Sequence, residues 1–142
     1  MRKSDAEPKP PIKKPAVFVG SSLKDLRELP NYVQGVFGRA ILNAQWGGKT
    51  RDAKPLKGYR GAGVLEIVED FQTDTYRAIY TLRFDSAIYV LHIFQKKSTQ
   101  GIKTSEKDLS LIASRLKTAE ANHLAFIAEE SKIADEERKN EK

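Results

Sequence analysis

The sequence contains no cysteine, which excludes a disulfide framework, a thiolate metal site and a cysteine nucleophile. No apolar run approaches the roughly 20 residues of a membrane span, and the basic N-terminus lacks the apolar stretch of a secretory signal. The two histidines, His92 and His123, are too far apart and too poorly supported by carboxylates to predict a metal site. We therefore expect a cytoplasmic protein with no membrane partner, no metal and no cofactor, which packing alone stabilises.

Charge is unevenly distributed along the 142 residues, whose 39% hydrophobic content suits one domain with one core. Residues 1–60 hold 13 Lys or Arg and 5 Asp or Glu, a net +8. Residues 61–142 hold 12 and 14, a net −2, and the sum is the overall +6. A basic excess of this kind favours anionic partners.

The two ends of the chain differ in composition from the middle. Residues 1–15 combine four prolines with lysines and have too little apolar surface to fold. Beyond Ala128 ten of the fourteen residues are charged, so a helix there would project and fray. We predict a flexible Pro/Lys-rich arm at 1–15, a folded domain at 16–128 and a fraying helix end at 129–142. The arm is either a solvated leader or a basic tether for RNA.

The hydrophobic pattern between these ends predicts an α+β fold. Short polar links join three β-rich segments, as in an antiparallel meander. Helically spaced apolar residues precede and follow that meander. In order, we expect a strand at 16–20, a helical turn at 21–29, a helix from 31 to a stop at 47–48, strands at 64–71, 76–84 and 87–95, and a helix capped by Ser105.

Two glycines, Gly35 and Gly38, lie inside the first long predicted helix, where each costs about 1 kcal/mol relative to alanine. We expect close packing against another backbone to be the reason for them. The segment at 46–63 that follows is rich in Gly and Lys, and we predict a long exposed loop that Leu56 anchors.

Cationic and aromatic groups recur at the ends of the predicted strands, which would offer a polyanion both charge and stacking surfaces. Arg77 and Tyr80 of the middle strand fall on opposite faces, because side chains alternate with period 2. The guanidinium of Arg77 has a planar fork for phosphate, and its alternative role is an ion pair with Glu66 or Glu69. We expect Tyr80 to belong to the core.

Lysines precede the middle strand, in the loop. Lys54 and Lys57 could bind phosphate, or their mutual repulsion could allow one of them to act as a base. They could also be solvated loop residues. Arg60 could extend the same basic surface.

The last predicted strand ends in Phe94-Gln95-Lys96-Lys97. Phe94 and Lys96 share a face, where the ring could stack on a base while Lys96 and Lys97 hold phosphate or donate a proton. The alternative is a core Phe94 beside edge-strand charges that discourage aggregation. Lys103 could extend this surface.

Other polar residues are expected to be structural. Nothing in the sequence aligns His92 with a second acid or base, so we expect a half-buried structural histidine, and a solvated one at His123. Ser21 and Ser22 are interpreted as a helix cap, because no histidine or acid that could activate them lies nearby in sequence.

Six short motifs follow one another between Val17 and Ala119: residues 18–27 (FVGSSLKDLR), 44–45 (AQ), 54–58 (KPLKG), 63–67 (GVLEI), 76–80 (YRAIY) and 94–97 (FQKK). In this order and spacing they resemble the RelE/HigB superfamily of bacterial toxins, in particular its phage-derived HigB-like branch. The resemblance implies a RelE-like twisted antiparallel sheet with two N-terminal helices and a C-terminal helix, the helices lying on one side.

The resemblance also implies a function. It implies the toxin of a type II toxin–antitoxin system, which cleaves mRNA on the ribosome, inhibits translation and is neutralised by a helix-turn-helix (HigA-like) antitoxin. The alternative is a non-catalytic, prophage-derived RNA- or protein-binding module, since the same basic surface would serve both.

RNA can be cut without a metal when its own 2′-hydroxyl attacks the adjacent phosphate. The protein then supplies a base, a cationic clamp and an acid for the leaving 5′ oxygen. As catalytic candidates we name Lys57, Arg77 and Lys96, and as RNA-binding candidates Lys54, Arg60, Phe94, Lys97 and Lys103.

Overall fold

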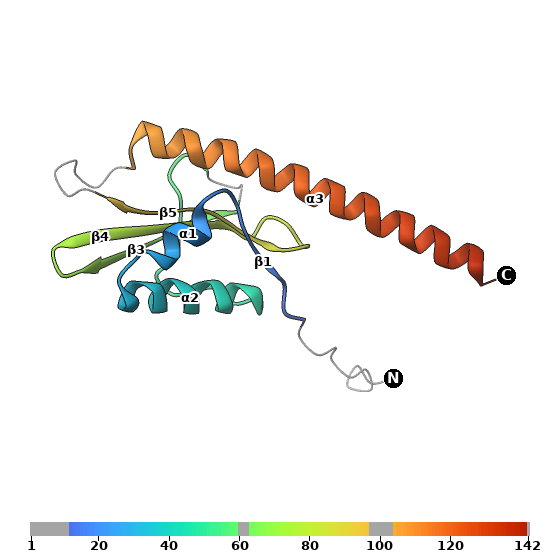
Figure 1. Cartoon of the computed structure of the whole chain (residues 1–142), viewed down its shortest axis with the longest axis horizontal. Coiled ribbons are helices and arrows are strands. Elements are labelled where there is room, and N and C mark those ends of the chain that lie inside the picture. The colour runs from blue at the N-terminus through green and yellow to red at the C-terminus, as the bar shows by residue number, and fades with distance from the viewer. Residues whose placement is uncertain (1–11, 60–62, 97–103, 142) are drawn as a thin grey trace, which may run out of the picture.

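A meander of three long antiparallel strands forms the centre of the protein (Figure 1). We describe it from a computed structural model, which covers residues 12–59, 63–96 and 104–141. The strands are β3 (Val64–Phe71), β4 (Asp74–Thr81) and β5 (Ile88–Lys96). Their β-branched and aromatic residues fit a pleated sheet, and the short link between β3 and β4 confirms the predicted meander.

Two short strands complete the sheet, in the order β1-β5-β4-β3-β2. Strand β1 (Ala16–Phe18) runs parallel to β5, and β2 (Lys54–Pro55) runs antiparallel to β3. The α+β fold class is confirmed, although the parallel edge strand makes the sheet mixed. The sequence analysis missed β2, which lies inside the predicted loop, but Leu56 anchors that loop as expected and is buried.

Three helices cover the sheet: α1 (Ser22–Arg27), α2 (Asn31–Gln45) and α3 (Glu106–Asn140). Figure 1 shows α2 and α3 on opposite faces. The α2 side holds a core with Phe37 and Tyr80, and the α3 side a core with Ile79 and Ile112. The expectation that the helices lie on one side is therefore wrong. Both faces of the meander are apolar, and each must be covered.

Strand β5 contains one extra residue. Ile79 of β4 pairs with His92, but the next residue, Tyr80, pairs with Val90, so Leu91 has no counterpart across the ladder. Such a bulge interrupts the alternation of side chains. Leu91 therefore packs on the α3 side, while Val90 and Ile93 pack on the α2 side.

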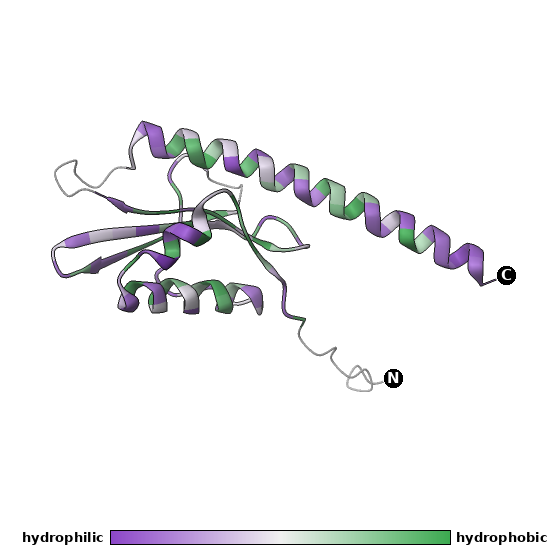
Figure 2. Cartoon of the chain, in the orientation of Figure 1, coloured by the Kyte–Doolittle hydropathy of each residue, from purple (hydrophilic) through white to green (hydrophobic). Residues whose placement is uncertain are grey.

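Helix α3 begins with the predicted cap: Ser105 Oγ accepts a hydrogen bond from the Asp108 backbone N–H at 3.1 Å. Its first turns bury Ile112 and Ala119 against the sheet. The helix then runs on to Asn140, beyond the sheet (Figure 1), and its projecting part alternates polar and apolar residues (Figure 2). No helix among the described residues is long and apolar enough to cross a membrane.

The two glycines of α2 do not pack against another backbone. A Cβ added to Gly38 would meet nothing within 4 Å. One added to Gly35 would meet only the guanidinium of Arg39, 3.2 Å away on the same helix. The predicted reason for these glycines is therefore wrong for the described part of a single chain.

Tyr80 is a core residue, as expected, and 1% of it is exposed. Its hydroxyl has no hydrogen-bond partner among the described residues, and burial raises its pKa to about 12. We predict that Tyr80→Phe raises the free energy of unfolding by about 1 kcal/mol, because it removes a buried polar group that gains nothing. Chemical denaturation of the two proteins measures this. A loss of stability would show that the hydroxyl has a partner.

Candidate active site

Polar side chains gather on the α3 side of the meander, near the N-terminus of α3. Glu66 comes from β3, Arg77 from β4, and His92 and Lys96 from β5. Asp108 of α3 joins them. We call these five residues the polar cluster. They lie beside the apolar core under α3, so the same face of the sheet carries both the core and the cluster.

Arg77 and Glu66 form the central ion pair of the polar cluster. Arg77 Nη1 lies 2.7 Å from Glu66 Oε2, and the two side chains are 7% and 19% exposed. This is one of the two carboxylate partners that the sequence offered as the alternative role of Arg77. A buried pair of this kind has a well-defined geometry, because breaking it would leave a charge unpaired in the interior. It places the carboxylate of Glu66 directly beside the guanidinium of Arg77.

Lys96 is 8% exposed and lies close enough to Arg77, Glu66 and Asp108 for their charges to act on it. Burial lowers the pKa of Lys96, and the positive charge of Arg77 lowers it further. Glu66 and Asp108 offset part of this effect, and the net pKa lies below the usual 10.5. Its ammonium group is therefore a better proton donor than that of a solvated lysine.

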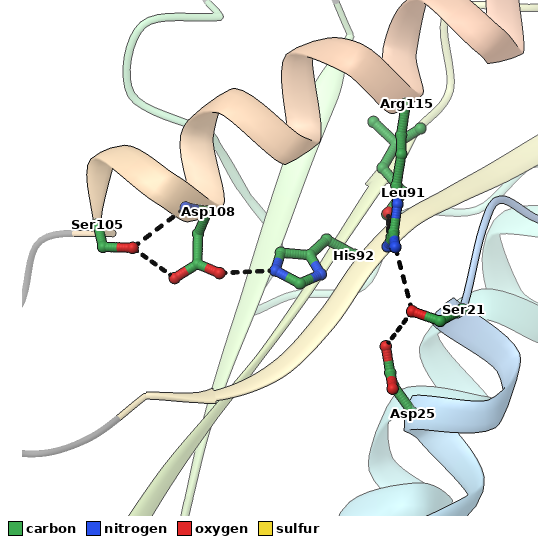
Figure 3. A network of polar contacts seen from close by, with 7 residues as sticks. All are labelled: Ser21, Asp25, Leu91, His92, Ser105, Asp108 and Arg115. Carbon is green, nitrogen blue, oxygen red and sulfur yellow. Dashed lines mark hydrogen bonds and ion pairs between the residues drawn. The ribbon is translucent and has the colours of Figure 1, made fainter.

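His92 connects the sheet to α3 (Figure 3). Its Nε2 lies 2.8 Å from Asp108 Oδ1, and Ser105 Oγ donates to Asp108 Oδ2 at 2.7 Å. On its other side the imidazole stacks on Phe94, with ring centroids 4.3 Å apart. Phe94 therefore has a fixed orientation beside Arg77, its cross-strand neighbour.

Asp108 is the residue of this cluster whose ionisation the surroundings favour most clearly. Burial by itself raises the pKa of Asp108, but the hydrogen bonds from Ser105 and His92 outweigh burial. The net pKa lies below its usual value of 3.8. An ionised Asp108 only accepts hydrogen bonds, so His92 Nε2 carries the proton and donates.

Arg115 of α3 holds the bulge in place (Figure 3). Its Nη1 donates to the carbonyl oxygen of Leu91 at 2.9 Å, and its Nη2 donates to Ser21 Oγ at 3.1 Å. Ser21 Oγ in turn donates to Asp25 Oδ2 at 2.8 Å. The bulged strand, α1 and α3 thus share one network, which keeps the end of α3 that carries Asp108 against the sheet.

The predicted site residues fall into three groups. Arg77, Phe94 and Lys96 lie together on the α3 side. Lys54 pairs with Glu66 across β2 and β3 and so shares this face, with its side chain exposed. Lys57 is exposed in the loop after β2, and no contact joins it to the polar cluster among the described residues. The other three candidates, Arg60, Lys97 and Lys103, lie outside the described residues.

Three members of the polar cluster were not predicted as functional candidates: His92, Asp108 and Glu66, which the sequence offered only as a possible ion-pair partner of Arg77. The expectation that His92 has no acid beside it is wrong, because Asp108 follows sixteen residues later and on another element. The only signal was the capping pattern at Ser105, which placed Asp108 in the first turn of a helix. His123 is not a solvated residue either: it contacts Phe84, and its Nδ1 lies 2.7 Å from Ser86 Oγ.

The predicted serine cap is only partly confirmed. Ser21 is the N-cap residue of α1, but its side chain makes no capping hydrogen bond. Ser22 is buried, and its hydroxyl donates to the Val90 carbonyl oxygen at 3.2 Å. The described residues contain no group of three His, Asp or Glu side chains arranged to hold a metal ion.

The fold and the polar cluster define a small α+β domain of net charge +6 that carries carboxylate, imidazole, ammonium and guanidinium groups on one face of its sheet. Residues 24–117 match the family model described as phage-derived protein Gp49-like (DUF891), and the chain belongs to this family. It is a family of RelE/HigB-type toxins of toxin–antitoxin systems, which confirms the resemblance seen in the sequence.

Similarity to individual proteins is weaker. No curated protein matches the sequence. Among solved structures, a chain of the toxin–antitoxin complex RelBE2 from Mycobacterium tuberculosis is similar, with 19% identity and a TM-score of 0.40. The similarity covers 60% of this chain and 93% of that one. The family assignment rests on the family model alone.

We predict that Asp108 stabilises the fold only while it is ionised. Because its folded-state pKa is lowered, this contribution is present above about pH 3.8, its unfolded value, and is lost as the pH falls through the lower folded value. The difference in melting temperature between wild type and Asp108→Asn should therefore shrink as the pH falls below about 3.8.

Asp85→Asn is the matched control for this measurement. Asp85 is exposed and outside the polar cluster. Asp85→Asn should therefore have the same melting temperature as the wild type at each pH. A difference for Asp108→Asn that stays constant across the acidic range would show that the carboxylate charge does not stabilise the fold.

Proposed function

We propose that this protein is a metal-independent mRNA endonuclease that acts on the ribosome, the toxin of a type II toxin–antitoxin pair. One observation carries the proposal: the buried pair of Arg77 and Glu66, with the ammonium group of Lys96 close to both. The proposed base, clamp and acid, which are Glu66, Arg77 and Lys96, are therefore neighbours on one face of the sheet. The family supports the toxin class, and the cluster supports the chemistry.

In the proposed reaction Glu66 takes the proton from a 2′-hydroxyl, and the 2′ oxygen attacks the adjacent phosphorus. Arg77 holds the phosphate oxygens and stabilises the charge that develops on them. As the P–O5′ bond breaks, Lys96 donates its proton to the leaving 5′ oxygen. The products are a 2′,3′-cyclic phosphate and a free 5′-hydroxyl, so protons and electron pairs balance without any further reactant.

Glu66 replaces Lys57 as the proposed base. A base must reach the 2′ oxygen of the nucleotide whose phosphate the clamp holds. Glu66 lies beside Arg77, whereas Lys57 is exposed on a separate loop. We propose that Lys57 binds the RNA backbone instead, together with the other basic candidates, which are Lys54, Arg60, Lys97 and Lys103.

Phe94 is the proposed stacking surface for a base next to the scissile phosphate. It is half-buried, stacked on His92 and directly across the strand pair from Arg77. A fixed aromatic face beside a phosphate clamp is suited to a splayed-out, single-stranded nucleotide. His92 and Asp108 are then positioning residues, because they act on RNA through Phe94.

The ribosome and an antitoxin are the proposed partners. Arg77 and Lys96 are almost fully buried, so little of the cluster is open to a freely diffusing RNA. A surface that presents mRNA in an attack geometry would supply the orientation that the small site lacks. A helix-turn-helix antitoxin would neutralise the protein, and both partners would place it in the cytoplasm.

We predict that induction of the wild-type protein stops growth and that Arg77→Ala and Glu66→Gln relieve the arrest. Arg77→Ala removes the clamp and should lower the cleavage rate by about 10²–10³. Glu66→Gln keeps the shape of the base but not its proton affinity, and should lower the rate by about 10²–10⁴. Cleavage of a defined mRNA by purified protein, with and without ribosomes, provides the rates.

Arg83→Ala is the matched control. Arg83 follows β4, is exposed and pairs with Glu120 of α3 rather than with the cluster, so its removal should leave cleavage unchanged. If soluble wild-type protein cleaves nothing on ribosomes but binds RNA equally well with and without Glu66→Gln, the protein is the non-catalytic binding module instead.

We also predict that a plot of the cleavage rate against pH has a descending limb at high pH. If Lys96 is the acid, the cleavage rate falls as the pH rises through its pKa, which lies below 10.5. Lys96→Arg keeps the positive charge but moves the proton loss beyond the measurable range, so the variant should cleave slowly and without this limb. A limb that is unchanged in Lys96→Arg would assign the acid to another residue.

A further inference from the structure

Val68 of β3 is a hydrophobic side chain that is partly open to solvent on the face of the polar cluster. It is 39% exposed, and every other large hydrophobic side chain of the described strands is less exposed. Because Val68 pairs with Arg77 across β3 and β4, the two side chains lie on the same face of the sheet. A single exposed valine is common on protein surfaces, so the argument depends on its position beside the guanidinium of Arg77.

Val68, Arg77 and Phe94 form one row across three neighbouring strands. Arg77 pairs with Val68 on β3 and with Phe94 on β5, so its side chain has a hydrophobic neighbour on either side. Neighbouring strands are about 4.8 Å apart, which places Val68 and Phe94 roughly 10 Å from each other. An RNA dinucleotide has the same order of groups, because one phosphate lies between two nucleobases.

The proposed proton-transfer groups lie on the two outer strands of this row. Glu66 is two residues before Val68 on β3, and Lys96 is two residues after Phe94 on β5. Side chains two residues apart lie on the same face of a strand. Each outer strand therefore carries one hydrophobic contact and one group that exchanges a proton, with Arg77 between them.

These positions set a direction for the RNA, and this step rests on the proposed function. The 2′-hydroxyl that Glu66 deprotonates belongs to the nucleotide before the cut, which we call the upstream nucleotide. The 5′ oxygen that Lys96 protonates belongs to the nucleotide after the cut, the downstream nucleotide. Since each group must reach its own oxygen, the upstream nucleotide lies over β3 and the downstream nucleotide over β5.

We propose that RNA crosses the sheet in the 5′-to-3′ direction from β3 to β5, with the upstream nucleobase on Val68 and the downstream nucleobase on Phe94. Val68 holds its nucleobase by van der Waals contact, and the ring of Phe94 stacks on the other. Neighbouring bases of a helical strand are only about 3.4 Å apart. The two contacts therefore hold this step unstacked, as is usual for single-stranded RNA that a protein recognises.

The charges around Val68 agree with this direction. Lys54 of β2 pairs with Glu66 across the edge of β3 and is exposed, so it can bind the phosphate before the upstream nucleotide. Asp70 lies two residues beyond Val68, where its carboxylate is exposed and accepts a hydrogen bond from Thr75 Oγ1 at 2.7 Å. A phosphate is attracted to the first position and repelled from the second. The upstream RNA is thus directed toward β2.

Kinetic cycles between side chains and nucleobases test the proposal. The full chain cleaves a defined mRNA on the ribosome, and two further mRNAs carry an abasic ribonucleotide, which keeps its 2′-hydroxyl, at the upstream or the downstream position. Val68→Ala should lower kcat/KM on the intact mRNA by about threefold to tenfold. It should cause no loss when the upstream nucleobase is absent, because the contact is already missing.

Phe94→Leu is the matching variant, because it keeps a hydrophobic side chain beside His92 and removes the aromatic face. It should lower kcat/KM about tenfold on the intact mRNA and cause no loss when the downstream nucleobase is absent. Each variant should keep its loss when the other nucleobase is absent. Leu124→Ala, at an exposed residue of the projecting part of α3, is the control and should cleave all three mRNAs like the wild type.

Two outcomes would overturn the proposal and leave the proposed function standing. In the first, Val68→Ala depends on the downstream nucleobase and Phe94→Leu on the upstream one, which reverses the direction of the RNA. In the second, Val68→Ala loses the same factor on all three mRNAs, or loses nothing, which shows that Val68 supports only the fold or has no role. A wild type that cleaves no mRNA on the ribosome would instead overturn the proposed function, and this inference with it.

Discussion

The extra residue in β5 is the constraint on which the candidate site depends. In a regular strand His92, Phe94 and Lys96 would continue the face of Val90 and point toward α2. Because Leu91 has no counterpart in β4, all three cross to the α3 side, where Glu66 and Arg77 already lie. One inserted residue therefore assembles the polar cluster, a role that bulges often have near active sites.

Helix α3 stabilises this irregular strand and completes the cluster. Arg115 donates a hydrogen bond to the carbonyl oxygen of the bulged residue, Leu91, and so supports the chain where the ladder is interrupted. One to two turns earlier on the same helix, Asp108 accepts from His92 and so fixes the ring that stacks on Phe94. The packing of α3 and the geometry of the cluster are thus coupled. A change that displaces the start of α3 would disturb both.

The two faces of the sheet have different chemistry. The α3 side combines buried charges with an aromatic pair, which is why we place RNA cleavage there. The α2 side is an apolar core that includes Phe37 and Tyr80.

The sequence by itself determined the order of the elements, because their patterns are local. Period-2 runs specified the meander, helical spacing specified α2 and the start of α3, and Ser105 marked the cap. It also indicated Arg77, Phe94 and Lys96, through charge, aromaticity and family motifs. These signals need no knowledge of which residues meet in space.

Only the tertiary structure decided which face each side chain occupies and which groups become partners. The bulge at Leu91 shifts the alternation by one residue, and no local pattern reveals an insertion of this kind. Arg77 pairs with Glu66 rather than with Glu69 because of the register between β3 and β4. His92 pairs with Asp108 because of the way α3 packs on the sheet. Contacts between distant segments follow from packing of the whole chain, so composition and spacing do not specify them.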